Sequence, residues 1–269
     1  MENLIVLIWW FIISAYSLYN IQKLYYLKYD KNNKVSYYIY QSSCMFIMAC
    51  SIRSIFPRID GYRVCMFNSW ISYPLVGRIL ATFGELAFVY QLTLVTKIFA
   101  RKFNCYKIYN TMNIVMGLIF IAQIFCWYGV LFQRNMMHVI EESIWMITML
   151  SIGYSYFYFY SLTRCKLFVY AFLISIGYTL FMIFIDIPMY YNRYLISNDR
   201  YLISNHPEYK SIYNTINDIS CCKTISSSYL IWKDAIPWMT GYFIGATFLS
   251  IKMNNIQEFL NWRKSSFLL

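Results

Sequence analysis

One long apolar stretch of this sequence, residues 68–96, carries two charged side chains, Arg78 and Glu85. In a helix, seven residues are about two turns, so the two side chains share one face. A charge within an apolar helix is costly and normally faces protein or water rather than lipid. The pattern therefore indicates either a structural ion pair that holds helices together or a buried charged site.

Six more ionisable residues lie near the ends of other apolar stretches. They are His138, Glu141, Glu142, Asp186, Lys233 and Asp234. Each also has a simpler interpretation, because acidic residues stabilise helix N-termini and the residues before a proline often end a helix. Together with Arg78 and Glu85, these six are the candidate residues of a polar cavity.

His138, Glu141 and Glu142 have the i, i+3 and i, i+4 spacing that places them on one helical face. This spacing could supply two metal ligands, whereas a site needs three or four. Glu85 or Asp234 would have to complete the set. The sequence therefore predicts no metal site and no cofactor, and it identifies no catalytic residue.

The elements that position these residues are apolar segments of membrane-spanning length. The chain is 59% hydrophobic and only 13% charged, with a mean hydropathy of +0.44. That composition is too apolar for an ordinary soluble domain. It predicts an all-α integral membrane bundle of about seven transmembrane helices, forming one domain over residues 1–269. The predicted spans are residues 4–19, 36–55, 70–95, 111–132, 137–162, 167–190 and 228–253.

The only long polar segment is residues 192–227, which we expect to form a loop. It holds NRYLISN followed at once by DRYLISN, a tandem copy of seven residues. Duplication of this kind indicates that the length of the loop is not critical. In an oxidising compartment, Cys65 could form a disulfide with Cys221 or Cys222 of this segment.

The net charge of +11 could suggest nucleic acid as a partner, but no basic block accompanies it. Instead, the basic residues are spread over short connections between apolar runs. Of the 23 lysines and arginines, 13 follow the odd-numbered spans and eight lie on the opposite side. This asymmetry predicts a multi-pass protein with its N-terminus outside or in the lumen and its C-terminus in the cytoplasm. The expected partner is the lipid bilayer.

The order of the spans places most of the candidate residues at a similar depth, roughly 6–12 Å below the outer surface at ~1.5 Å per residue. Glu85 is expected deeper, near the middle of the membrane. We therefore predict one polar cavity on the side of the long loop. Because about 10 Å of helix separates Arg78 from Glu85, a direct contact is not expected. The sequence instead predicts that Arg78 pairs with Glu142 and that Glu85 faces the cavity.

Several segments carry a resemblance: RSIFPRIDGYRVCMFNSWIS, GRILATFGELAFVYQ, EESIW and WKDAIPWMTGYF. With them the chain resembles a family of uncharacterised multi-pass membrane proteins from large DNA viruses of protists, Mimivirus-like, and from algae. The resemblance covers the second to seventh spans and implies a viral or host membrane, but no activity. It draws attention to Arg53, Arg58, Arg78, Glu85, Glu142, Trp145, Asp234 and Trp238.

Three functions remain open. The first is a bundle that binds or transports a small polar or lipid ligand in the cavity. The second is a membrane-embedded, lipid-modifying enzyme with Glu85 or Glu142 as acid or base. The third is a purely structural membrane protein. The sequence favours the first, since two histidines and no serine–histidine motif leave few groups for catalysis.

Overall fold

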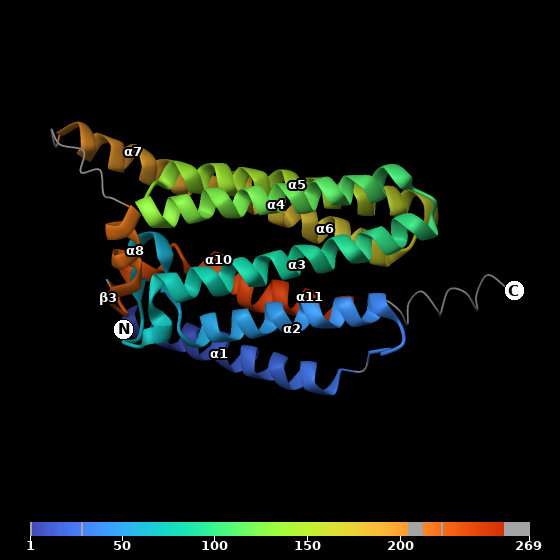
Figure 1. Cartoon of the computed structure of the whole chain (residues 1–269), viewed down its shortest axis with the longest axis horizontal. Coiled ribbons are helices and arrows are strands. Elements are labelled where there is room, and N and C mark those ends of the chain that lie inside the picture. The colour runs from blue at the N-terminus through green and yellow to red at the C-terminus, as the bar shows by residue number, and fades with distance from the viewer. Residues whose placement is uncertain (1, 28, 204–211, 222, 256–269) are drawn as a thin grey trace, which may run out of the picture. The chain divides into compact units, whose positions relative to one another are not determined.

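Helices make up nearly all of the structure, a computed structural model that describes residues 2–27, 29–203, 212–221 and 223–255 (Figure 1). The chain divides into two compact units. The first contains Met1–Ile59, Arg63–Val95 and Lys223–Leu269, and the second contains Asp60–Tyr62 and Thr96–Cys222. The all-α class is confirmed.

The first unit is built from the first three long helices and the last segment of the chain. Its helices are α1 (Glu2–Tyr26), α2 (Lys34–Ile55), the first part of α3 (Pro74–Lys102), α9 (Tyr229–Trp232), α10 (Ile236–Thr240), the π-helical η4 (Gly241–Ala246) and α11 (Thr247–Met253). The 3-10 helix η2 (Trp70–Ser72) precedes α3. The Asn33 side chain accepts hydrogen bonds from the Val35 and Ser36 amides and so caps the start of α2.

A small sheet joins the connections at one end of the first unit. Its strands are β1 (Arg58–Ile59), β2 (Val64–Cys65) and β3 (Thr224–Ile225). β2 lies between the other two, antiparallel to β1 and parallel to β3. Because β3 precedes the last helices, the sheet ties their start to the loop after α2.

The second unit contains the end of α3 and the helices that follow it. They are α4 (Tyr106–Phe132), α5 (Asn135–Thr163), α6 (Lys166–Phe181), the π-helical η3 (Met182–Asp186), α7 (Ile187–Ile203) and α8 (Ile212–Cys221), with the 3-10 helix η1 (Asp60–Tyr62). Two-residue connections join α4 to α5 and α5 to α6. Gln133 and Arg164 adopt positive φ there and end α4 and α5. These short links force consecutive helices to pack antiparallel.

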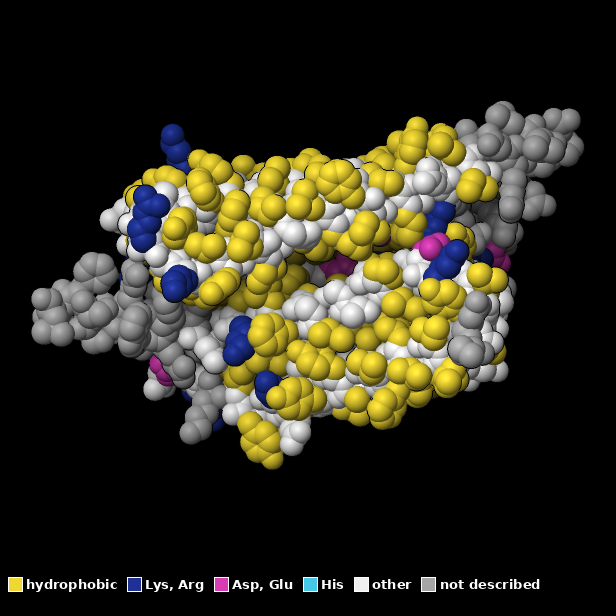
Figure 2. Space-filling view, turned by 180° about the vertical axis from the view of Figure 1, so that it is seen from behind, with side chains coloured by type: hydrophobic (Ala, Val, Ile, Leu, Met, Phe, Trp, Pro, Cys, Tyr) yellow, Lys and Arg dark blue, Asp and Glu magenta, His cyan; other side chains and the backbone are white. Residues whose placement is uncertain are grey.

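Within the described residues, four helical segments are long and apolar enough to cross a membrane: Asn3–Tyr26, Pro74–Lys102, Tyr106–Phe132 and Lys166–Ile196. Large apolar side chains cover their outer faces, as in one view of the surface (Figure 2). Phe11 is 67% exposed on α1, and Phe184 is 71% exposed in η3. These faces suit a lipid environment rather than water.

The interior of the first unit is partly polar, whereas the outer faces of its helices are largely apolar. The Gln91 amide donates to the Ser43 hydroxyl at 2.6 Å and to the Ser250 carbonyl at 2.9 Å, which connects α3, α2 and α11. The Asn20 amide donates to the Thr247 hydroxyl at 2.9 Å and connects α1 with α11. Small polar residues that hydrogen-bond across helices are typical of packing inside membranes.

The polar segment 192–227 is not simply a loop. The helix that was expected to end near residue 190 continues as α7 to Ile203, and α8 follows from Ile212. The physical reason is visible in the sequence, because no glycine or proline lies between Pro188 and Pro207 to stop the helix. The last residues of the tandem copy, 204 and 205, lie outside the described residues.

The last predicted span, 228–253, is also interrupted. Its helix breaks after Trp232 and resumes at Ile236 as α10. Pro237, which has no amide hydrogen, is accommodated in the first turn of α10. Gly241 and Gly245 lie in π-helical η4, and an added Cβ at either position would meet no atom within 4 Å.

Candidate functional site

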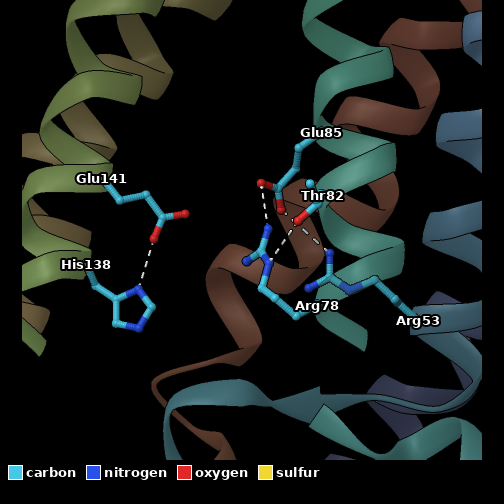
Figure 3. Close-up of polar contacts among 6 residues, drawn as sticks. All are labelled: Arg53, Arg78, Thr82, Glu85, His138 and Glu141. Carbon is cyan, nitrogen blue, oxygen red and sulfur yellow. Dashed lines mark hydrogen bonds and ion pairs between the residues drawn. The ribbon is translucent and has the colours of Figure 1, made fainter. Parts of the chain in front are cut away.

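Glu85 is the centre of a buried ionic cluster in the first unit (Figure 3). Its Oε2 lies 3.0 Å from Nη2 of Arg78, and its Oε1 lies 3.8 Å from Nη1 of Arg53. The Arg78 Nε also donates to the Thr82 hydroxyl at 3.4 Å. The side chains of both arginines are 6% exposed and that of Glu85 is 12% exposed. One carboxylate from α3 thus joins two guanidinium groups, one from α2 and one from its own helix.

The expectation that Arg78 and Glu85 are too far apart for contact was wrong. The backbone separation of about 10 Å holds, but both side chains are long. Side chains lean toward the N-terminus of a helix, which brings the Glu85 carboxylate toward Arg78. Thr82 lies between them in the sequence, and its hydroxyl accepts a hydrogen bond from the Arg78 Nε. The predicted pair of Arg78 with Glu142 would join the two units and stays a prediction.

Arg53 is the member of this cluster that the spacing of charges missed. It lies in the last turn of α2, at the end of an apolar run. The residue is 5% exposed, and its guanidinium group lies 5.3 Å from the ring centre of Tyr242 and 5.9 Å from that of Phe243. The two rings belong to η4, so Arg53 connects the last helical segment with the cluster. Cation–π contacts of this kind gain strength away from water.

Arg58 is a third buried arginine of the first unit, at the start of β1. Its Nη1 donates to the carbonyls of Ile71 at 2.8 Å and Tyr73 at 2.7 Å. Its guanidinium group lies over Gly77, where an added Cβ would be 1.8 Å from Cζ. Gly77 thereby makes room for the side chain that holds the start of α3.

Lys233 and Asp234 occupy the break between α9 and α10 in the first unit, and both side chains are exposed. They therefore lie beside a helix start at Ile236 rather than within a continuous helix over residues 228–253.

The second unit has its own buried polar cluster, built around His138 of α5. The His138 Nδ1 lies 2.9 Å from Oε2 of Glu141, one turn later (Figure 3). The two residues are 5% and 4% exposed, whereas Glu142 is only partly buried. Tyr190 stacks on the imidazole ring with centres 4.9 Å apart. Of the two adjacent glutamates, Glu141 is thus the buried one that contacts the histidine.

Asp186 belongs to the same cluster and is 6% exposed. It interacts electrostatically with Glu141, His138 and Arg193. The alternative that Asp186 ends a helix was wrong, since the chain continues through η3 into α7. A π-helical turn before Pro188 accommodates the missing amide hydrogen and keeps Asp186 facing the interior.

Cys126 of α4 is the residue of this cluster that sequence reasoning missed. Its sulfur and one ligand atom each of His138 and Glu141 all lie within 4.8 Å of one another, and all three residues are buried. A signal existed in the sequence. Only two residues link α4 to α5, so positions equally far from the link face each other. Cys126 and Glu141 are such a pair.

The disulfide that the sequence suggested between Cys65 and Cys221 is absent from the described residues. Cys65 and Cys221 both carry free thiols, and Cys222 lies outside the described residues. The Cys65 sulfur instead donates to the Thr224 carbonyl at 3.7 Å beside the small sheet. Burial raises the pKa of the Cys65 thiol, which makes it a poor nucleophile at neutral pH.

Comparison with known proteins found no relative for this chain. No family model, curated protein or solved structure matches it. Five of the eight candidate residues form two clusters, one in each unit: Arg78 and Glu85 in the first, and His138, Glu141 and Asp186 in the second. A single cavity shared by both clusters would involve both units, and it stays a prediction.

Proposed function

We propose that this protein crosses the membrane seven times and binds a small ligand with an anionic group, such as a phospholipid head group, at Arg53, Arg78 and Glu85. The observation that carries the proposal is the convergence of two buried arginines on one carboxylate. The N-terminus would then lie outside and the C-terminus in the cytoplasm, as the distribution of basic residues indicates.

Seven crossings require α2, α5 and the last helical segment to span the membrane along with the four most apolar segments. α2 has 22 residues and α5 has 29, enough for about 30 Å of hydrocarbon. Both also expose apolar side chains, including Met48 on α2 and Tyr154 on α5. Their lower hydropathy comes in part from serines and charged residues that face the interior, where lipid does not meet them.

The chemistry of the arginine side chains supports an anionic ligand. Two guanidinium groups share one carboxylate in the cluster, so the three side chains carry a net positive charge. Because arginine forks match phosphate and carboxylate groups, an anionic head group suits these donors. Both Glu85 oxygens pair with arginines, which suits ligand positioning better than proton transfer.

The ligand proposal can be tested by thermal unfolding of the purified protein in a neutral detergent. We expect short-chain phosphatidic acid to raise the melting temperature until binding saturates. At 100 times its Kd, the lipid should raise the free energy of unfolding by about 2.7 kcal/mol. Short-chain phosphatidylcholine should not. Inorganic phosphate distinguishes recognition of the anion alone from recognition of the lipid.

Arginine-to-lysine variants sharpen this test, because lysine keeps the charge but loses the fork. Arg53→Lys and Arg78→Lys should weaken phosphatidic acid binding at least tenfold. The matched control is Arg101→Lys in the exposed last turn of α3. If no anion stabilises the wild-type protein, the cluster is instead a structural link, in which the Arg53–Glu85 contact joins α2 with α3.

The topology makes a separate prediction about Cys105 and Cys221. In single-cysteine variants, an impermeant maleimide applied to intact cells should label Cys221 and leave Cys105 unlabelled until the membrane is opened. Burial raises the pKa of the Cys105 thiol, although a hydrogen bond with Tyr158 partly offsets this. Because a raised pKa leaves little reactive thiolate at neutral pH, the labelling of the two cysteines should be compared at alkaline pH. Labelling of Cys105 from outside would reverse the proposed orientation.

A further inference from the structure

The cluster of Cys126, His138 and Glu141 has no part in the anion site proposed above. Its residues come from two helices of the second unit that a two-residue link holds side by side. The three ligand atoms lie within 4.8 Å of one another. A tetrahedral zinc site with bonds of about 2.0–2.3 Å separates its ligand atoms by roughly 3.3–3.8 Å. Small side-chain rotations would therefore bring the three atoms to ligand distances.

The imidazole of His138 gives an independent indication of a missing ligand. Its Nε2 is buried and has no hydrogen-bond partner in the described part of the chain. A buried polar atom without a partner costs about 1–3 kcal/mol. The other nitrogen, Nδ1, is held by Glu141 at 2.9 Å. As a ligand of an ion shared with His138, Glu141 would exchange this hydrogen bond for a bond to the ion, because one carboxylate cannot accept from Nδ1 and bind an ion on Nε2 at the same time.

The surroundings hold the imidazole firmly in this place. Gly129 of α4 faces the ring, and an added Cβ there would lie 2.8 Å from Nε2. Tyr190 covers the ring by stacking. A metal site needs ligands that are fixed before the ion arrives, and this packing supplies that order.

The charge of the cluster also favours a cation. Glu141 and Asp186 are buried carboxylates that interact with each other electrostatically. Like charges in a shared buried site are unfavourable, and a divalent ion would relieve their repulsion. Asp186 lies in η3, and π-helical turns are frequent at functional sites.

We propose that Cys126, His138 and Glu141 bind a divalent transition metal ion of the zinc class, with Asp186 as the nearby balancing charge. Thiolate and imidazole ligands select zinc and similar ions over magnesium and calcium, which prefer oxygen. Three protein ligands leave a fourth position for water or another ligand. That number is typical of zinc sites with an open position rather than of closed structural ones.

The test uses full-length protein in detergent, stripped of metal with a chelator and titrated with Co²⁺. We expect one Co²⁺ per chain, a thiolate-to-cobalt charge-transfer band, and displacement of Co²⁺ by Zn²⁺. Cys221 and Cys222 are replaced by serine in the background so that this adjacent pair contributes no signal. Absence of the charge-transfer band in this background would overturn the proposal.

Variants assign the ligands. Cys126→Ser should abolish the charge-transfer band, and His138→Gln should weaken binding at least tenfold. The matched control is Cys50→Ser, which removes a buried cysteine from α2 in the first unit. Gly129→Ala should also weaken binding, because the added Cβ displaces the imidazole. Equal affinity in Cys126→Ser and the parent would contradict the site.

Zinc-edge X-ray absorption of the unmutated protein covers the case in which Cys126→Ser fails to fold. The expected first shell contains one sulfur together with nitrogen and oxygen. A shell of nitrogen and oxygen alone would rule out Cys126 as a ligand.

Discussion

Glu85→Leu is expected to lower the free energy of unfolding by about 3–5 kcal/mol. The Glu85 carboxylate contacts Arg78 at 3.0 Å and Arg53 at 3.8 Å, and all three side chains are at least 88% removed from solvent. Without it, two buried guanidinium groups lose their carboxylate partner, and arginine cannot lose its charge by deprotonation. The measurement is reversible unfolding in mixed detergent micelles, followed by circular dichroism.

Multiple substitutions separate the loss of the ion pair from the loss of the site. If the charges matter mainly to one another, replacing Arg53 and Arg78 by methionine together with Glu85→Leu should restore most of the lost stability. A double-mutant cycle of Arg78→Leu with Glu85→Leu should give a coupling free energy of about 0.5–3 kcal/mol. The same cycle with Glu142→Leu tests the pair expected from the sequence. Additive losses for Arg78 and Glu85 would contradict the pairing described above.

Gly77→Ala is expected to be the second most damaging change, at about 1–3 kcal/mol. Its Cβ would lie 1.8 Å from both Cζ and Nε of Arg58, so the guanidinium group has to move. Moving it breaks the hydrogen bonds to the carbonyls of Ile71 and Tyr73, which precede α3. Because Arg58 is 3% exposed, water cannot readily replace those contacts.

Gly117→Ala is the matched control for this change. Gly117 lies within α4, and an added Cβ there meets no atom within 4 Å. Alanine favours helix over glycine by about 1 kcal/mol, so this variant should be neutral or slightly more stable. If Arg58 is the cause of the damage, Gly77→Ala should add little to the loss already seen in Arg58→Ala. An equal loss from Gly77→Ala in both backgrounds would point to the helix itself.

The all-α class and the approximate helix positions could be read from the sequence, because each depends on local composition. Runs of apolar residues between basic connections predict helices of spanning length. The predicted span 36–55 corresponds to α2, and the span 137–162 corresponds to α5. The candidates Arg78, Glu85, His138, Glu141 and Asp186 were found in the same way, since a charge in an apolar run stands out without any knowledge of the fold.

Only the tertiary structure decided which of these residues contact one another. Spacing along a helix gives the distance between backbones, but the reach and direction of long side chains decided that Arg78 meets Glu85. Arg53 and Cys126 joined the clusters from other helices. The local sequence around Arg53 gives no sign of a partner, and Cys126 can be matched with Glu141 only once the length of the link between α4 and α5 is known. The break before Ile236 and the π-helical turn at Asp186 depend on how proline residues fit into packed helices. Local sequence thus determined which residues cannot face lipid, and packing determined what they face instead.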